Sequence, residues 1–234
     1  WQGVLGHLGE MRSPTQYPLA KDVVRWQGEP VAVVVANKRA LAEDASELVE
    51  IDYEDLDAQL DMETAMDKST KVIHDDLGNN LFWTRTVNQG DVSEAFKQSH
   101  IVEEVTLDFA RHTGVTLETR AIVADWDSSE ERMTVYHNGQ APHMMQSIIA
   151  KHLNITEGLV RIISCDVGGS FGIKVHVYPD EMVTVAVSKL LKRPVKFVAD
   201  RLESYSTDIH SRCHKISGKI GVDDKGKILA FEID

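Results

Sequence analysis

A glycine-rich stretch at residues 166–174, Asp-Val-Gly-Gly-Ser-Phe-Gly-Ile-Lys, constrains this chain more than any other segment. It follows an apolar run at 159–163 and precedes a helix-like pattern at 179–191. A strand, a glycine-rich turn and a helix in succession can present bare backbone N–H groups to an anionic or polar ligand, because glycine permits positive φ and close approach. The spacing matches neither the Walker loop nor the dinucleotide fingerprint, which disfavours a nucleotide-binding protein. On these residues alone, a ligand loop and a simple connector both remain open.

Composition restricts the class of protein. The 234 residues are 42% hydrophobic and 26% charged, enough for one large or two small globular domains. A net charge of −12 argues against a nucleic-acid partner, since polyanions bind basic surfaces. The sequence contains no secretory signal and no apolar run near the ~20 residues of a membrane span. We therefore expect a cytoplasmic protein without a membrane partner.

The two cysteines, Cys165 and Cys213, have no metal-ligand spacing, and we expect two buried free thiols in a reducing compartment, with a disulfide left open. The chain starts at Trp1 and stops at Asp234 inside a strand-like pattern, so we expect it to be a piece of a longer protein.

The pattern of the first quarter predicts a small α/β unit. Two β-branched runs at 23–26 and 31–36 flank a Gly-Glu-Pro turn and predict a hairpin. A helix at 38–48 and a strand at 49–53 follow. The polar, acidic segment 55–80 is the natural connector. We predict an α+β fold with domains at 1–75 and 76–234.

The remainder mixes helices and strands without an internal repeat. Periodicity and turn residues predict helices at 91–99, 140–153 and 179–191, and a loop or short helix at 205–210. The predicted strands lie at 101–109, 121–126, 133–137, 160–164, 195–199, 213–222 and 227–233, the last two as a hairpin.

Four segments, in order, resemble signatures of the molybdenum-containing hydroxylases, the family of xanthine dehydrogenase, aldehyde oxidase and the carbon monoxide dehydrogenase large subunit. They are Asn-Gly-Gln-Ala-Pro-His at 138–143, the loop at 168–174, Lys-Arg-Pro-Val-Lys-Phe-Val-Ala-Asp-Arg at 192–201, and the α/β pattern within 23–53. The last resembles the family's hammerhead domain. The resemblance implies a partial hammerhead domain followed by the first part of a mixed α/β molybdenum cofactor-binding domain.

The resemblance also implies a cofactor, molybdenum–molybdopterin in a dinucleotide form, beside the glycine loop. The cofactor-binding residues carried over are Gln140, Gly168, Gly169, Ser170, Phe171 and Gly172. In similar proteins the matching glutamine hydrogen-bonds an oxygen ligand of molybdenum, a role suited to a neutral amide donor. A solvent-exposed glutamine at a helix start is the alternative. Ser170 stands where relatives have a third glycine, and no residue is expected to ligate the metal directly.

Three residues resemble the family's substrate side: Glu118, Arg120 and Val175. A surface ion pair between Glu118 and Arg120 is the alternative. Xanthine dehydrogenases place a substrate-binding glutamate at the position of Val175, so the chain is more similar to the carbon monoxide dehydrogenase branch, which includes oxidases of nitrogen heterocycles.

The implied function is oxidation of a small aldehyde, nitrogen heterocycle or CO-like substrate with water-derived oxygen by a molybdenum-dependent oxidoreductase. The expected partners are the remainder of the large subunit, iron–sulfur and FAD-containing subunits, and the small-molecule substrate. In relatives the general base is a glutamate that would lie beyond Asp234, so this piece is expected to contain no catalytic residue and to be inactive alone. The alternative is a non-catalytic assembly or subunit-interaction module, whose glycine loop only packs.

Overall fold

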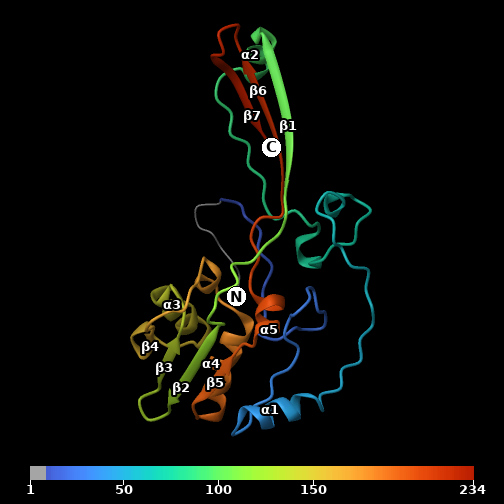
Figure 1. The fold of residues 1–234 in the computed structure, drawn as a ribbon. Coiled ribbons are helices and arrows are strands. Elements are labelled where there is room, and N and C mark those ends of the chain that lie inside the picture. Colours follow the sequence, from blue (N-terminus) through green and yellow to red (C-terminus); the bar gives the residue numbers. More distant parts are fainter. Residues whose placement is uncertain (1–8) are drawn as a thin grey trace. The chain divides into compact units, whose positions relative to one another are not determined.

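The computed structural model describes residues 9–234, which form two compact units (Figure 1). Unit 1 contains the described residues up to Trp83 together with Gly114–Ile209, and unit 2 contains Thr84–Thr113 and His210–Asp234. This division follows contacts between residues and not the order of the chain. The domains at 1–75 and 76–234 stay a prediction.

Unit 1 is built on a four-stranded sheet with the order β4-β3-β2-β5. Its strands are β2 (Ala121–Asp127), β3 (Arg132–His137), β4 (Val160–Ile163) and β5 (Val195–Val198). β2 pairs antiparallel with β3 and β5, whereas β4 runs parallel to β3. Alternate residues of β2 and β3 are buried, and these residues face one another across the pair. One face of the sheet therefore forms the core, as period-two alternation requires.

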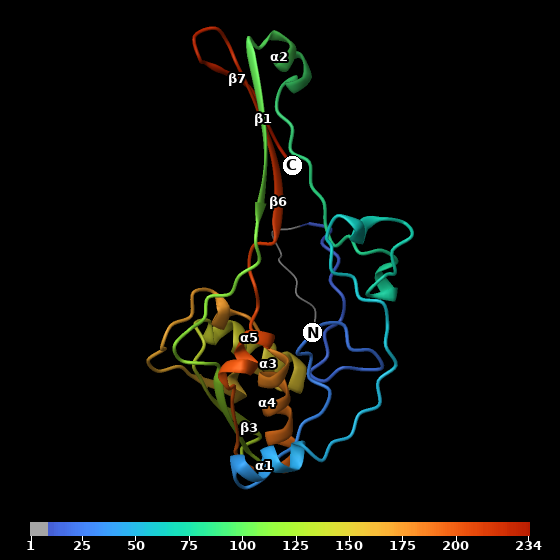
Figure 2. The same cartoon turned by 45° about the vertical axis from the view of Figure 1, so that its right-hand side comes forward.

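Two helices, α3 (Pro142–Leu153) and α4 (Pro179–Leu191), lie side by side on this face (Figure 1, Figure 2). Each helix has a proline at its first position. Each is followed by a C-cap residue in the left-handed region with φ of 54°, Asn154 after α3 and Lys192 after α4. The core contains Met133, Val135, Met145, Ile149, Met182 and Val185, all at most 5% exposed. Each such side chain contributes roughly 1.5–3 kcal/mol by leaving water.

Helix α5 (Arg201–Thr207) corrects the prediction of a loop or short helix at 205–210. It begins earlier because Asp200 and Glu203 form a capping box. Oδ1 of Asp200 accepts from the backbone N of Glu203 at 2.7 Å, and Oε2 of Glu203 accepts from the backbone N of Asp200 at 2.6 Å. Two short 3₁₀ helices complete this part, η3 (Glu157–Leu159) before β4 and η4 (Ile173–Val175) after the glycine loop.

The first described segment contains α1 (Arg39–Ser46), which confirms the helix predicted at 38–48, and the 3₁₀ turns η1 (Thr64–Met66) and η2 (Asp75–Leu77). The predicted hairpin at 23–36 and the strand at 49–53 are wrong, since neither segment is a strand in the structure. Their β-branched residues favour an extended backbone, but a strand also needs a partner for its hydrogen-bond ladder. Within the described residues these segments have no such partner, and Val33 and Val35 are 43% exposed.

Unit 2 is an antiparallel sheet with the order β1-β6-β7 and one helix (Figure 2). Its strands are β1 (Ile101–Phe109), β6 (His214–Val222) and β7 (Ile228–Ile233), and the predicted hairpin of β6 and β7 is confirmed. Helix α2 (Val92–Gln98) packs against β7. It starts as predicted, because Oδ1 of Asp91 accepts from the backbone N of Glu94 at 2.9 Å.

Both cysteines are free, but both are exposed, so the expectation of buried thiols is wrong. Cys165 lies two residues after the end of β4, and Cys213 lies directly before the start of β6. Both cysteines are therefore outside the strands, where the chain leaves the sheet. In the described part of the chain, no helix has the length and apolar character needed to cross a membrane.

Candidate functional site

The glycine loop and Gln140 lie together at one edge of the sheet in unit 1. Gln140 follows β3 and the loop follows β4, and the carboxyl ends of these parallel strands meet at the same edge. The backbone N of Gln140 donates to the carbonyl O of Lys174 at 3.1 Å. Oγ of Ser164 donates to the carbonyl O of Gly139 at 2.8 Å. Gln140 and the loop, which the resemblance assigned to one cofactor site, are therefore neighbours in the structure.

The loop has an unusual backbone. Gly169 and Gly172 have φ of 95° and 91°, and Phe171 has φ of 51°. A bulky side chain at positive φ costs on the order of 1–3 kcal/mol, and Phe171 also leaves 79% of its surface exposed. The N–H groups of Gly169, Ser170, Phe171 and Gly172 donate no hydrogen bond within residues 9–234. Free donors beside an outward aromatic ring form a surface that fits a large polar ligand.

The carboxamide of Gln140 is joined to this loop through Ser170. Oγ of Ser170 donates to Oε1 of Gln140 and accepts from the backbone N of Lys174, the second bond at 3.0 Å. Gln140 is exposed, and its Nε2 makes no hydrogen bond in the part of the chain that the structure describes. The arrangement leaves a neutral amide donor directed away from Ser170.

Glu118 holds the start of the loop. Its Oε2 accepts from the backbone N of Gly168 at 2.8 Å and from Nζ of Lys174 at 2.7 Å. Burial raises the pKa of Glu118, but these two donors outweigh it and keep the pKa below its ordinary value. A Cβ at Gly168 would lie 2.5 Å from Cβ of Glu118, so this close approach requires glycine.

Arg120 is fully buried and does not pair with Glu118, so the alternative of a surface ion pair between them is wrong. Its guanidinium binds Asp180 in a bidentate manner at 2.6 and 2.8 Å and Asp208 at 2.6 Å. It also lies 3.8 Å from the ring centroid of Tyr178. Burial lowers the pKa of Arg120, but the carboxylates of Asp180 and Asp208 raise it by more than burial lowers it. The pKa is therefore above its ordinary value, and the guanidinium stays charged. Arg120 therefore ties β2 to α4 and α5 from within the core.

A second buried pair, between His137 and Glu181, was not predicted from the sequence. Nε2 of His137 lies 2.9 Å from Oε1 of Glu181, and each side chain is 3% exposed. A Cβ at Gly139 would lie 2.2 Å from the His137 ring, so this pair fixes the backbone just before Gln140. The alternation of β3 contained the signal, because His137 shares the inward face with Met133 and Val135. Val175, the remaining predicted site residue, is half-buried in η4 next to Lys174.

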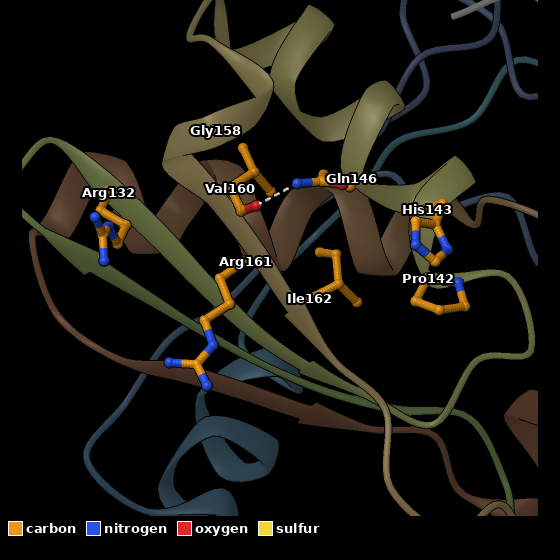
Figure 3. A pocket seen from close by; sticks show the side chains of 8 residues that line it. All are labelled: Arg132, Pro142, His143, Gln146, Gly158, Val160, Arg161 and Ile162. Atoms are coloured by element: carbon orange, nitrogen blue, oxygen red, sulfur yellow. Dashed lines mark hydrogen bonds between the residues drawn. The ribbon is translucent and has the colours of Figure 1, made fainter.

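A cavity of about 390 Å³ lies elsewhere in unit 1, along α3 and β4 (Figure 3). Nε2 of Gln146 donates to the carbonyl O of Val160 across it at 2.8 Å, and none of its lining residues is a predicted site residue. A smaller cavity of about 210 Å³ is lined by His137, Asn138, Cys165 and Asp166, near the glycine loop in sequence. Among residues 9–234, no three His, Cys, Asp or Glu side chains gather as a metal site.

Two family models match this chain. A family model described as the molybdopterin cofactor-binding domain matches residues 73–234. A second, the a/b hammerhead domain of aldehyde oxidase and xanthine dehydrogenase, matches residues 4–57.

Individual relatives support the same assignment. The nicotine 6-hydroxylase large subunit of Paenarthrobacter nicotinovorans is 36% identical over 90% of this chain and 26% of its own length. The carbon monoxide dehydrogenase large chain of Hydrogenophaga pseudoflava is 31% identical over 92% of this chain and 28% of its own. The crystal structure of quinoline 2-oxidoreductase from Pseudomonas putida 86 superposes with a TM-score of 0.91 and 30% identity, covering 97% of this chain and 29% of that one.

The chain thus spans about a quarter of the length of the curated relatives it matches. Its larger matched segment contains Gln140 and the whole glycine loop, the residues that the structure brings together. This chain belongs to the molybdopterin cofactor-binding family of molybdenum hydroxylase large subunits.

Proposed function

We propose that residues 138–174 form one wall of a molybdenum–molybdopterin site in the large subunit of a molybdenum hydroxylase. The observation that carries this proposal is the link between Gln140 and the glycine loop through Oγ of Ser170. It gathers a neutral side-chain donor, free backbone donors and an exposed aromatic ring at one sheet edge. Such a set suits a large group that carries oxygen atoms and a flat ring system.

Each residue has a defined part in this proposal. Nε2 of Gln140 donates a hydrogen bond to the bound group without adding charge, and the N–H groups of residues 169–172 serve its polar atoms. Phe171 packs against the pterin and excludes water, which offsets the cost of its positive φ. Bound molybdenum with its pterin supplies a redox centre for adding water-derived oxygen to an electron-poor carbon. The chain offers no direct metal ligand in this assignment.

The substrate side is proposed at Glu118 and Val175, with Arg120 supporting it from the core. Val175 presents no charge next to the loop, which favours a neutral substrate over one held by a carboxylate. The matched nicotine hydroxylase and quinoline oxidoreductase favour a nitrogen heterocycle among the three proposed substrate classes. A small aldehyde and a CO-like substrate are the other two.

The remaining assignments concern the assembly. We propose that the rest of the large subunit supplies the general-base glutamate, and that iron–sulfur and FAD groups on other subunits accept the electrons. The proposed pterin is a dinucleotide, and the proposed location is the cytoplasm. Without the rest of this assembly, the present chain is proposed to be inactive.

The test is the molybdenum and pterin content of this chain alone and of the chain co-expressed with the rest of its large subunit. Elemental analysis gives the metal, and fluorescence after oxidative release gives the pterin. We expect both in the assembly and their loss in the double variant Gln140→Ala, Phe171→Ala. A matched control, Gln89→Ala with Phe231→Ala, removes an exposed glutamine and an exposed phenylalanine of unit 2 and should retain both.

Folded protein without pterin in every preparation contradicts the proposal. That result favours a non-catalytic assembly or subunit-interaction module. Equal pterin content in the double variant and the control also contradicts it, because Gln140 and Phe171 would then have no part in holding the cofactor.

A further inference from the structure

We propose that Ser170 is a positioning residue: its hydroxyl fixes the carboxamide of Gln140 with Oε1 toward the loop and Nε2 toward the bound group. This inference rests on the proposed function for its consequence, but its geometry is present in the chain itself. Ser170 and Gln140 lie 30 residues apart in sequence and meet at the edge formed by β3 and β4.

The hydrogen bonds of Ser170 determine which end of the Gln140 carboxamide faces the loop. A serine hydroxyl has one proton to donate and lone pairs that accept. The backbone N of Lys174 donates to Oγ of Ser170 at 3.0 Å, so an accepting position is filled. The hydroxyl proton is donated to Oε1 of Gln140, because the NH₂ end of an amide has no lone pair that could accept it. This assigns the two ends of a carboxamide that are otherwise nearly symmetric.

The backbone around Gln140 is held by hydrogen bonds, so the remaining freedom of this residue lies in its side chain. Its N donates to the carbonyl O of Lys174 at 3.1 Å, and the carbonyl O of Gly139 accepts from Oγ of Ser164 at 2.8 Å. The His137 ring packs closely on Gly139, where an added Cβ would lie 2.2 Å from the ring. With its backbone held on both sides, an exposed glutamine still rotates its amide unless a side chain stops it. Ser170 is the residue placed to do so.

The consequence concerns the ligand-facing atom. If the carboxamide turns by half a rotation, an acceptor replaces the donor that faces the bound group. A glycine or alanine at position 170 would leave both orientations open, and only one of them donates. Groups that orient a contacting residue in this way typically change affinity or activity 10–100-fold when removed.

The first experiment needs no cofactor. Side-chain ¹⁵N relaxation of the glutamine amides in this chain reports their mobility, with the Gln140 signals assigned by their loss in Gln140→Glu. We expect Gln140 to be as ordered as Gln146, whose Nε2 donates to two carbonyl groups at 2.8 and 3.0 Å. In Ser170→Ala its order parameter should fall below about 0.6, the range of flexible sites, while Ser170→Thr keeps it high. Gln146 is the internal control.

Two outcomes overturn the inference. One is a Gln140 amide that is as mobile as exposed Gln89 in the unaltered chain, a result that needs no variant to fold. The other is an unchanged order parameter in Ser170→Ala.

A second experiment uses the assembled large subunit. We expect Ser170→Ala to retain the pterin content but to lower kcat about tenfold, and Ser170→Thr to restore it. Loss of pterin in both variants would assign the effect to side-chain volume and overturn the inference. Absence of pterin in the unaltered assembly would instead contradict the proposed function, while the relaxation result would still stand. The two failures are therefore distinguishable.

Discussion

Nζ of Lys174 lies 2.7 Å from Oε2 of Glu118, and the two side chains differ sharply in exposure, 1% against 40%. The ammonium group is therefore buried beside the glycine loop, whereas the carboxylate still reaches water. A buried charge without a partner costs far more than an exposed one. The two halves of this ion pair should respond differently to substitution.

Removing the carboxylate should be the more damaging change. Glu118→Ala leaves the Lys174 ammonium unpaired in the interior and should lower the free energy of unfolding by on the order of 3 kcal/mol. Lys174→Met keeps the buried volume and leaves Glu118 to water and the N–H of Gly168, so the loss should be about 1 kcal/mol. Denaturant midpoints of unit 1 measure both. Glu43→Ala, which breaks an exposed pair with Arg39 in the same unit, should change stability by less than about 1 kcal/mol, and equal effects in all three contradict the asymmetry.

Acid should release the loop through the same carboxylate. The folded-state pKa of Glu118 lies below the ordinary value of 4.5, so its stabilisation is complete above that pH and is lost as the pH falls through the folded-state pKa. The amide proton of Gly168, which donates to Oε2, should shift along this titration. Glu118→Gln should abolish the shift. A Gly168 titration that persists in that variant would assign the effect to another group.

Alkali should destabilise unit 1 through Tyr178. Burial raises the pKa of this phenol above its ordinary value of 10.0, so the folded state keeps the proton after the unfolded chain has lost it. The free energy of unfolding should therefore fall as the pH rises above about 10. Comparing Tyr178→Phe with the unaltered chain between pH 8 and 11 measures this slope. The variant should start less stable, because Tyr178 Oη donates to Ile173 and accepts from Ile209, and should lose stability less steeply.

A methyl group at Gly139 should displace the backbone next to Gln140, because it would clash with the His137 ring. A Cβ at Gly139 would lie 2.2 Å from the His137 ring, which Glu181 holds in the core. Gly139→Ala should cost roughly 1–3 kcal/mol and shift the amide signals of Gln140. Gly158→Ala is the matched control, since no atom lies within 4 Å of its added Cβ. Equal stability of the two variants would show that the His137 ring can move aside.

Sequence patterns predicted those helices and strands whose formation depends mainly on residues close to them in the chain. β1 and α4 match their predicted bounds, and β6 and β7 form the expected hairpin. Their periodicity and turn residues act over a few positions. The segment 23–36 shows the limit, because its residues favour an extended backbone but a ladder needs a partner strand that sequence pattern does not specify.

In the candidate site, too, some features could be predicted from the sequence and others depended on the tertiary structure. Its residue types and motif order, Gln140 and the loop at 168–172 among them, are properties of the sequence. That Arg120 is buried between two aspartates followed from contacts with residues 60 and 88 positions away. No local pattern separates such a residue from an arginine at the surface.

By itself, the sequence determined an α+β chain with a ligand-type glycine loop and a neutral amide donor. Only the tertiary structure decided that Ser170 meets Gln140 and that Glu118 holds Gly168. The physical reason is the parallel pairing of β3 and β4, which places their carboxyl ends at one edge. That pairing depends on side chains packed beneath the sheet from α3 and α4, and so on the whole core of unit 1.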